Sequence, residues 1–234
     1  MGTLYIVSTP IGNIQDITLR AVNLLGNVDI IACEDTRKTG LFLKRLKIPR
    51  RAQLISYYEE NELKRIPEII KFLKDNKNVA LVSNAGTPTI SDPGYKLVKE
   101  CISSGIKVSP LPGSSAILAA LVVSGLPTDK FLFLGYLPKK SGKRKKLLKD
   151  CKKILFSYTL IIFESPYRII KLLNEIKEIF GETEIVICNE LTKMFEKIIR
   201  GKPDKIIKTF QKNPLKGEIT LLLKPPPFSD PGSN

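Results

Sequence analysis

The residue types best suited to holding a small ligand lie in two glycine- and proline-bearing loops of this 234-residue chain. The longer loop, Ser83 to Gly94, reads SNAGTPTISDPG. Within it, Gly86 permits a ligand to approach the backbone closely, and Thr87 offers a hydroxyl. Turn-forming residues at this density exceed what a strand-to-helix connection needs, so the segment predicts a shaped binding loop.

The second loop, Pro110 to Ala116, reads PLPGSSA and leads into an apolar helix. Unpaired N–H groups in the first turn of a helix can bind polar ligand atoms. A plain helix cap at Ser114 explains this loop equally well when it is taken alone. Because both loops follow predicted strands, the two together predict one pocket.

Several familiar chemistries are excluded by what the sequence lacks. There is no histidine, and the four cysteines form no C-x-x-C pair. The commonest general base, the Ser-His-Asp triad, the usual zinc sites and a redox dithiol are therefore absent, and no metal site is expected. The missing signatures G-x-G-x-x-G and G-x-x-x-x-G-K-[ST] disfavour a dinucleotide enzyme and a P-loop ATPase.

The charge balance points to a polyanionic partner. Lys and Arg number 38 against 23 Asp and Glu, a formal net charge of +15. The excess concentrates in one basic run, whose members are Lys139, Lys140, Lys143, Arg144, Lys145 and Lys146. Phosphate contact is the natural use of such a run, and a solvated helix face is the ordinary alternative. Because Ser141 and Gly142 lie inside the run, we predict a flexible arm that precedes a helix.

The chain carries no signal of membrane insertion or export. Its longest apolar stretch, residues 116–123, is shorter than the roughly 18 residues that a spanning helix requires. The N-terminal segment lacks the basic leader of a signal peptide. We therefore expect a cytoplasmic protein without a membrane partner.

The elements that position the loops alternate in type through the first half of the chain. Strands are predicted at 4–8, 28–33, 53–57, 79–83 and 107–111, and helices at 18–25, 36–46, 61–75, 95–104 and 114–124. We expect Gly26 and Gly105 to end two of these helices. This alternation favours an α/β fold with a mostly parallel sheet, which binds ligands at the carboxyl ends of its strands.

A second series begins after the turn-rich segment GLPTDK at 125–130. Strands are predicted at 131–134, 159–163, 184–188, 196–199 and 218–223, and helices at 142–155, 166–180 and 203–211. This series predicts a second α/β domain with more antiparallel character. The expected division is an N-terminal domain at 1–113, a C-terminal domain at 114–224 and a flexible tail at 225–234.

Eight short segments occur in one order: TPIGN, EDTR, SNAGTPTISDPG, PGSSA, FLGYLPKK, ESPYR, ELTK and KGE. In this the chain resembles the bacterial 16S rRNA cytidine 2′-O-methyltransferases of the tetrapyrrole methylase fold superfamily, from about residue 4 to residue 223. The resemblance implies two α/β domains with S-adenosylmethionine in the cleft between them. It also implies a homodimer that methylates a cytidine ribose of the small ribosomal subunit. Asn84, Tyr167 and Asn189 depart from the family, which typically shows Asp, His and Arg there.

Carried onto this sequence, the resemblance assigns site residues. It places the cofactor against Pro10, Ile11, Gly12, Ala85, Gly86, Thr87, Ile90, Ser115, Ala116, Phe163 and Leu191. Backbone groups and small side chains would supply most of these contacts. Arg37, in the EDTR segment, joins the basic run as a candidate RNA contact.

Methyl transfer to a ribose hydroxyl is a displacement at carbon, to which alignment and exclusion of water contribute most. Because the hydroxyl is a weak nucleophile, a nearby carboxylate can accept its proton, and the candidates are Glu34, Asp35 and Asp92. Glu34 and Asp35 can equally pair with Arg37 as scaffold. Asp92 can equally be the N-cap of the following helix, with Pro93 as its first residue.

Two other functions compete with this interpretation. One is a methyltransferase of the same fold that acts on a tetrapyrrole or a protein side chain, and the basic run argues against it. The other is a noncatalytic RNA-binding protein. The paired loops argue against that function, because a binding module needs no narrow cofactor pocket.

Overall fold

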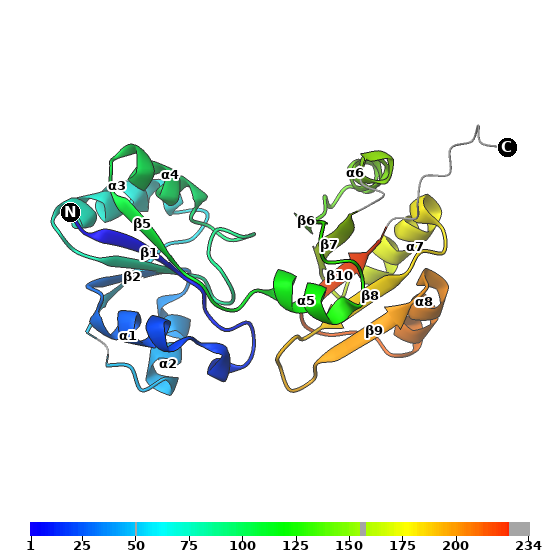
Figure 1. Cartoon of the computed structure of the whole chain (residues 1–234), viewed down its shortest axis with the longest axis horizontal. Helices are drawn as coiled ribbons and strands as arrows, with labels where there is room; N and C mark the ends of the chain where they lie inside the picture. Colours follow the sequence, from blue (N-terminus) through cyan, green and yellow to red (C-terminus); the bar gives the residue numbers. More distant parts are fainter. Residues whose placement is uncertain (50, 155–157, 225–234) are drawn as a thin grey trace. The chain divides into compact units, whose positions relative to one another are not determined.

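The computed structural model describes residues 1–49, 51–154 and 158–224, and the chain divides into two compact units (Figure 1). The first unit is Met1–Ser115 and the second is Ala116–Asn234. This division falls close to the boundary expected between residues 113 and 114. The tail predicted at 225–234 lies outside the described residues.

The first unit contains a five-stranded sheet whose strands are all parallel, in the order β3-β2-β4-β1-β5. Its strands are β1 (Thr3–Val7), β2 (Ile30–Cys33), β3 (Gln53–Ser56), β4 (Val79–Val82) and β5 (Lys107–Leu111). Every residue of β2 and β4 is buried, as expected for central parallel strands that are covered on both faces. The predicted parallel α/β sheet is confirmed.

Helices cover both faces of this sheet (Figure 1). They are α1 (Leu19–Asn27), α2 (Thr36–Arg45), α3 (Glu62–Lys74) and α4 (Tyr95–Ser103), with a short 3₁₀ helix, η1, at Ile14–Asp16. Ile31 packs in one hydrophobic cluster with residues of α1 and α2, and its neighbour Ile30 packs in another with residues of α3 and α4. Successive residues of a strand point to opposite faces, so a continuous apolar strand builds two cores.

Helix α1 does not end at Gly26, where the sequence predicts its end. The helix includes Gly26 and Asn27, and the N–H of Val28 bonds to the carbonyl of Leu24. Gly26 keeps an ordinary negative φ, so it is not the left-handed glycine that commonly ends a helix. Gly105, with φ of +67°, does follow α4 in that conformation.

The second unit contains a mixed sheet in the order β6-β7-β10-β8-β9. Its strands are β6 (Phe131–Tyr136), β7 (Thr159–Glu164), β8 (Ile185–Asn189), β9 (Lys197–Gly201) and β10 (Ile219–Leu223). Only the β6–β7 pair is parallel, and the other pairs are antiparallel, which confirms the more antiparallel character of this half.

The described part of the second unit contains four helices: α5 (Ala116–Ser124), α6 (Ser141–Ile154), α7 (Ile169–Phe180) and α8 (Pro203–Lys212). Helices α6, α7 and α8 share one hydrophobic cluster with β7, β8 and β10, and α5 contacts β10 (Figure 1). Across the described part of the chain, no helix combines the length and the apolar composition that crossing a membrane would need.

Candidate active site

Three loops are joined at the carboxyl ends of the neighbouring strands β1, β4 and β5. Thr9 and Gly86 exchange two backbone hydrogen bonds, from Thr9 N to Gly86 O at 2.8 Å and from Gly86 N to Thr9 O at 3.0 Å. The hydroxyl oxygens of Ser8 and Thr87 lie 2.8 Å apart. Thr87 Oγ1 also donates to the carbonyl of Ser114 at 3.3 Å. The two loops predicted to form one pocket are therefore connected through Thr87.

The backbone conformation of Gly86 determines how this loop turns. Gly86 has φ of +78°, in the left-handed region that favours glycine, and it is buried. A Cβ built on it would lie 3.5 Å from Cγ2 of Ile11. The structure thus gives Gly86 a turning role, which lets the chain pair with Thr9, and the close ligand approach at Gly86 stays a prediction.

Two residues further along the same loop also have positive φ values, Thr89 at 76° and Ser91 at 60°. Non-glycine residues adopt such values only when the surrounding structure holds them there. Buried hydroxyls supply part of that support near the start of the loop, where Thr9 Oγ1 donates to the carbonyl of Ser83 at 3.2 Å. The loop is therefore a constrained structure.

The far end of the loop is held by the buried carboxylate of Glu62. Its Oε1 accepts from Gly94 N at 3.0 Å and from the Tyr57 hydroxyl at 2.7 Å, and its Oε2 lies 3.0 Å from Lys96 Nζ. Burial by itself raises the pKa of Glu62, but the hydrogen bonds and Lys96 outweigh it and leave the pKa below its usual value. Sequence reasoning missed Glu62, because it reads as an ordinary acidic residue in the first turn of α3.

We expect Glu62→Gln to reduce the free energy of unfolding by about 1–3 kcal/mol, because an amide cannot accept from three donors as the carboxylate does. Denaturation in urea measures the change. The lowered pKa means that the contribution of Glu62 is present above its unfolded-state pKa and is lost as the pH falls, so the difference should shrink in acid. Glu59→Gln, at an exposed position beside the same loop, is the control and should have little effect. Equal effects of the two substitutions would contradict the role of Glu62.

The first residue of helix α4 agrees with the helix predicted at 95–104, but its N-cap does not. Its first residue is Tyr95, and its N-cap is Gly94 with φ of +133°. The prediction of Asp92 as N-cap and Pro93 as first helical residue is therefore wrong. Glycine is required at 94 because a Cβ there would lie 2.7 Å from Cδ2 of Leu81. Asp92 lines a hollow of about 260 Å³ between this loop and the start of α3.

Asp35 has the scaffold role that the sequence left open. It is the N-cap of α2 and accepts from Arg37 N at 2.9 Å and from Lys38 N at 3.4 Å. The Arg37 guanidinium also lies 3.0 Å from its Oδ2. Hydrogen bonds from Arg37 lower the pKa of Asp35 to about 2. Asp35 is thus a poor proton acceptor near neutral pH.

Glu34 is hydrogen-bonded to Asn84, one of the three residues at which this chain departs from the family pattern. Glu34 Oε1 accepts from Asn84 N, and Oε2 accepts from Asn84 Nδ2, both at 3.0 Å. This clamp connects the end of β2 to the loop after β4. An asparagine amide can donate to the carboxylate, whereas an ionised aspartate at 84 would repel it. The structure therefore supplies a reason for asparagine at this position.

In the second unit, the ELTK and KGE segments form one structure at the end of β8. Oε1 of Glu190 accepts from Glu218 N at 2.9 Å and from Lys193 Nζ at 2.8 Å. The hydrogen bond from Lys193 lowers the pKa of Glu190. Gly217 is needed beside this carboxylate, since a Cβ there would overlap it. Leu191 is buried within this turn.

The ESPYR segment follows β7 and makes a second charged structure. The Arg168 guanidinium donates to both carboxylate oxygens of Glu164, at 2.6 and 2.9 Å, and to the carbonyl of Leu137 at 3.2 Å. The neighbouring Phe163 ring packs edge-on against Phe133, with ring centroids 4.8 Å apart. Glu164 and Arg168 therefore brace the end of β7, where Phe163 lies.

Residues 3–207 match the family described as Tetrapyrrole (Corrin/Porphyrin) Methylases. The chain belongs to that family. The resemblance that the ordered motifs indicated is confirmed.

Relatives of this methylase chain carry a narrower name. This chain is 47% identical over 223 residues to the Ribosomal RNA small subunit methyltransferase I of Thermotoga maritima, and the match covers 95% of this chain and 98% of the relative. It is also 47% identical to the protein of the same name from Hydrogenobaculum sp., covering 94% of each. The chain is therefore a member of the ribosomal RNA small subunit methyltransferase I family.

Solved structures share the methylase fold at low identity. The uroporphyrin-III C-methyl transferase of Thermus thermophilus, complexed with S-adenyl homocysteine, superposes with a TM-score of 0.65 at 16% identity, covering 95% of this chain and 97% of that one. A diphthine synthase superposes with a TM-score of 0.72 at 14% identity, covering 95% and 90%. The predicted two-domain α/β fold is confirmed.

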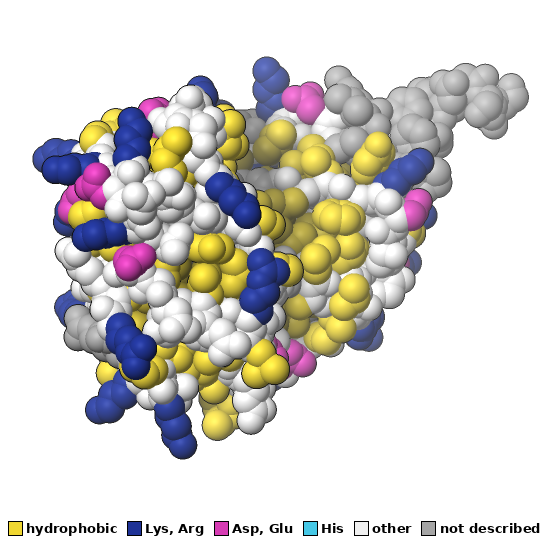
Figure 2. Space-filling model, turned by 60° about the vertical axis from the view of Figure 1, so that its left-hand side comes forward, with side chains coloured by type: hydrophobic (Ala, Val, Ile, Leu, Met, Phe, Trp, Pro, Cys, Tyr) yellow, Lys and Arg dark blue, Asp and Glu magenta, His cyan; other side chains and the backbone are white. Residues whose placement is uncertain are grey.

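The basic run of this methylase is not a flexible arm. Lys139 and Lys140 precede α6, and the rest of the run lies on that helix, which begins at Ser141, where the Ser141 hydroxyl donates to Glu175 Oε1 at 2.7 Å. Lys139, Lys140, Lys143 and Lys146 are exposed. Figure 2 shows that Lys and Arg side chains are also scattered over the face of the first unit that is turned forward. The positive charge is therefore spread over the surface as well as gathered on α6.

Arg144 is the exception within the basic run, and the prediction of an RNA contact there is wrong. The residue is 2% exposed. Its Nε and Nη2 donate to the two carboxylate oxygens of Glu175, at 2.5 and 2.7 Å. Its Nη1 donates to the carbonyls of Pro138 and Lys139. Because its guanidinium faces inward, Arg144 holds α6 on α7 and is left out of the RNA-binding set.

The predicted cofactor residues fall in both units of this methylase. Those of the first unit lie after β1, β4 and β5, and they are Pro10, Ile11, Gly12, Ala85, Gly86, Thr87, Ile90 and Ser115. Those of the second unit are Ala116, Phe163 and Leu191. Within the first unit, the hydrogen bonds of Thr9 and Thr87 connect the three loops that carry them.

Proposed function

We propose that this chain transfers a methyl group from S-adenosylmethionine to the ribose 2′-hydroxyl of a cytidine in small-subunit ribosomal RNA. The observation that carries the proposal is the connected set of loops after β1, β4 and β5, held together through Thr9, Gly86 and Thr87. Family membership and the name that the relatives share support the rRNA substrate. The choice of a cytidine 2′-hydroxyl as the methylated position is based on the motif resemblance.

The residues at the first-unit loops fit the proposed cofactor. Small and apolar side chains at Ala85, Thr87 and Ile90 leave main-chain groups as the polar contacts, which suits a zwitterionic ligand. Ala85 and Thr87 are half-buried, and Ile90 is exposed. When bound, S-adenosylmethionine supplies a methyl group that its sulfonium already activates. The loops would bind it and orient it.

Glu34 is the candidate that fits the proton acceptor best. Asp35 is occupied as the cap of α2, and its lowered pKa makes it a weak base. Asp92 lies on the hollow beside the start of α3. Glu34 is half-buried and follows β2, at the same edge of the sheet as the cofactor loops, and Asn84 orients its carboxylate. In the proposed reaction it would accept the hydroxyl proton as the ribose oxygen takes the methyl group and the methyl–sulfur bond of the donor breaks, with S-adenosylhomocysteine leaving.

We expect Glu34→Gln to lower kcat by about 10²-fold, at the lower end of general-base effects, because alignment of the reactants still contributes. A glutamine amide can still pair with Asn84, so the dissociation constant for S-adenosylmethionine should be unchanged. Single-turnover methylation and calorimetry measure the two quantities. Asp35→Asn is the matched control and should keep full activity, since asparagine is an equally good N-cap. Full activity of Glu34→Gln would exclude Glu34 as the base.

RNA contact is proposed for the exposed cations Arg37, Lys139, Lys140, Lys143 and Lys146, and for the half-buried Lys145. The direct test of the proposed function is mass mapping of ribose methylation in small-subunit rRNA from cells with and without the protein. A single cytidine that loses its 2′-O-methyl group is the expected result. Unchanged rRNA methylation would refute the proposal. Light scattering of the purified protein tests the homodimer that the resemblance implies.

A further inference from the structure

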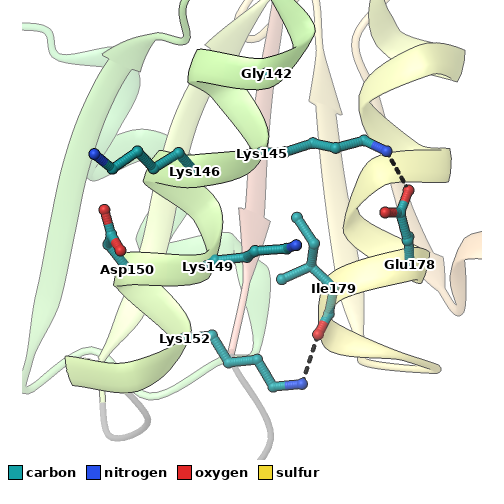
Figure 3. Close-up of a pocket in the computed structure, with 8 residues that line it drawn as sticks. All are labelled: Gly142, Lys145, Lys146, Lys149, Asp150, Lys152, Glu178 and Ile179. Atoms are coloured by element: carbon teal, nitrogen blue, oxygen red, sulfur yellow. Dashed lines mark hydrogen bonds and ion pairs between the residues drawn. The ribbon is translucent and has the colours of Figure 1, made fainter.

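A groove between α6 and α7 is lined by Lys145 and Lys146 of the basic run and by two further lysines of α6, Lys149 and Lys152. Lys145, Lys149 and Lys152 follow one another at the spacing i, i+4, i+7, so they lie on one face of α6. Figure 3 shows that all three extend toward α7. The groove has a volume of about 750 Å³. It is therefore large enough for an extended ligand.

The two end lysines of this row are already oriented by α7. Lys145 pairs with the carboxylate of Glu178, and Lys152 donates to the carbonyl of Ile179 (Figure 3). Ile179 lies in the last turn of α7, where the helix dipole favours a cation. Lys149 lies between them, and its side chain is directed into the groove (Figure 3). The three ammonium groups are thus presented as a row.

The charge of the groove favours an anionic chain. Four lysines line it with only two carboxylates, Asp150 and Glu178, so its net charge is +2. The helical rise places successive members of the row about 4.5 to 6 Å apart along the axis of α6. A row of cations at repeated spacing suits a ligand with several linked anionic groups, whereas a single small anion would meet only one or two of them.

We propose that this groove binds the phosphate backbone of the RNA substrate, and that an RNA phosphate replaces Glu178 as the partner of Lys145. The inference rests on the proposed function, which supplies RNA as the polyanion. Lys149 and Lys152 extend the proposed RNA contact beyond the basic run at 139–146. Glu178 is an exposed counter-ion that competes with the RNA, since its side chain is 54% accessible.

Two substitutions with opposite expected effects test the groove. Lys149→Gln removes one phosphate contact and should weaken binding of RNA by about 3- to 10-fold. It should also reduce the slope of log K against log[salt] by nearly one. Glu178→Gln removes the competitor and should tighten binding by a similar factor. The measurement is fluorescence anisotropy with a labelled rRNA fragment, using the full chain at several salt concentrations.

Lys208→Gln is the control, because it removes the same charge at an exposed position on α8. The affinity of Lys208→Gln for RNA should stay within twofold of that of the wild type, after allowance for the change in net charge. The proposal that the groove binds RNA is overturned if Lys149→Gln has the same RNA affinity as this control, or if Glu178→Gln fails to tighten RNA binding. Absence of RNA binding by the wild type would overturn it as well. If RNA binding follows these predictions but the RNA is not methylated, the RNA-binding role of the groove is supported and the proposed reaction is contradicted.

Discussion

Replacing Gly86 with valine is expected to abolish measurable binding of S-adenosylmethionine, with a loss of about 100-fold or more. Gly86 has φ of +78°, a conformation that costs a β-branched residue about 1–3 kcal/mol. The valine methyl groups would also meet Ile11, because a Cβ alone already lies 3.5 Å from its Cγ2. Relief of this strain breaks the pairing with Thr9 that joins the loops. At 1.4 kcal/mol for each tenfold change, these effects together reach the expected loss.

The matched control for this substitution is Gly105→Val. Gly105 has φ of +67° and so carries a similar backbone penalty, but a Cβ there meets nothing within 4 Å. Gly105 precedes the amino end of β5, whereas the cofactor loops follow the carboxyl ends of the strands. Calorimetric titration with S-adenosylmethionine should therefore find normal affinity in Gly105→Val and none in Gly86→Val. Undiminished affinity in Gly86→Val would contradict the proposed position of the cofactor.

Replacing Arg144 with methionine is expected to lower the free energy of unfolding by about 3–5 kcal/mol. The side chains of Arg144 and Glu175 are 3% and 5% exposed, so the substitution leaves a buried carboxylate without its partner. Burial alone raises the pKa of Glu175, but hydrogen bonds from Arg144 and Ser141 bring the net pKa below its usual value. The pair therefore contributes stability above the unfolded-state pKa of Glu175 and loses it as the pH falls.

Two variants distinguish burial from charge as the cause. Lys145→Met breaks the exposed pair with Glu178 on the same two helices and should cost at most about 1 kcal/mol. The double variant Arg144→Met with Glu175→Met removes both buried charges and should recover most of the loss. Guanidinium denaturation followed by circular dichroism measures all of them. Similar losses in Arg144→Met and Lys145→Met would show that the Arg144 pair is no more important than a surface pair.

The strands and most helices could be predicted because their signals are local. The continuous apolar runs of β2 and β4 are typical of strands covered on both faces, and the structure buries every residue of both. Helix ends were harder. Asp92 fits a good capping rule for α4, but the buried Glu62 accepts a hydrogen bond from Gly94 N, and Gly94 is the N-cap. A contact across 32 positions thereby overrides a local preference.

The sequence by itself determined the alternation of elements, the position of the loop from Ser83 to Gly94, and the family, since ordered motifs and apolar runs are properties of neighbouring residues. Only the tertiary structure decided which charged side chains are available. Arg144 is one of six basic residues in a run of eight, yet it is buried on Glu175, 31 positions away. The partner of each charge depends on which helices pack together, and a single sequence carries no local signal for that choice.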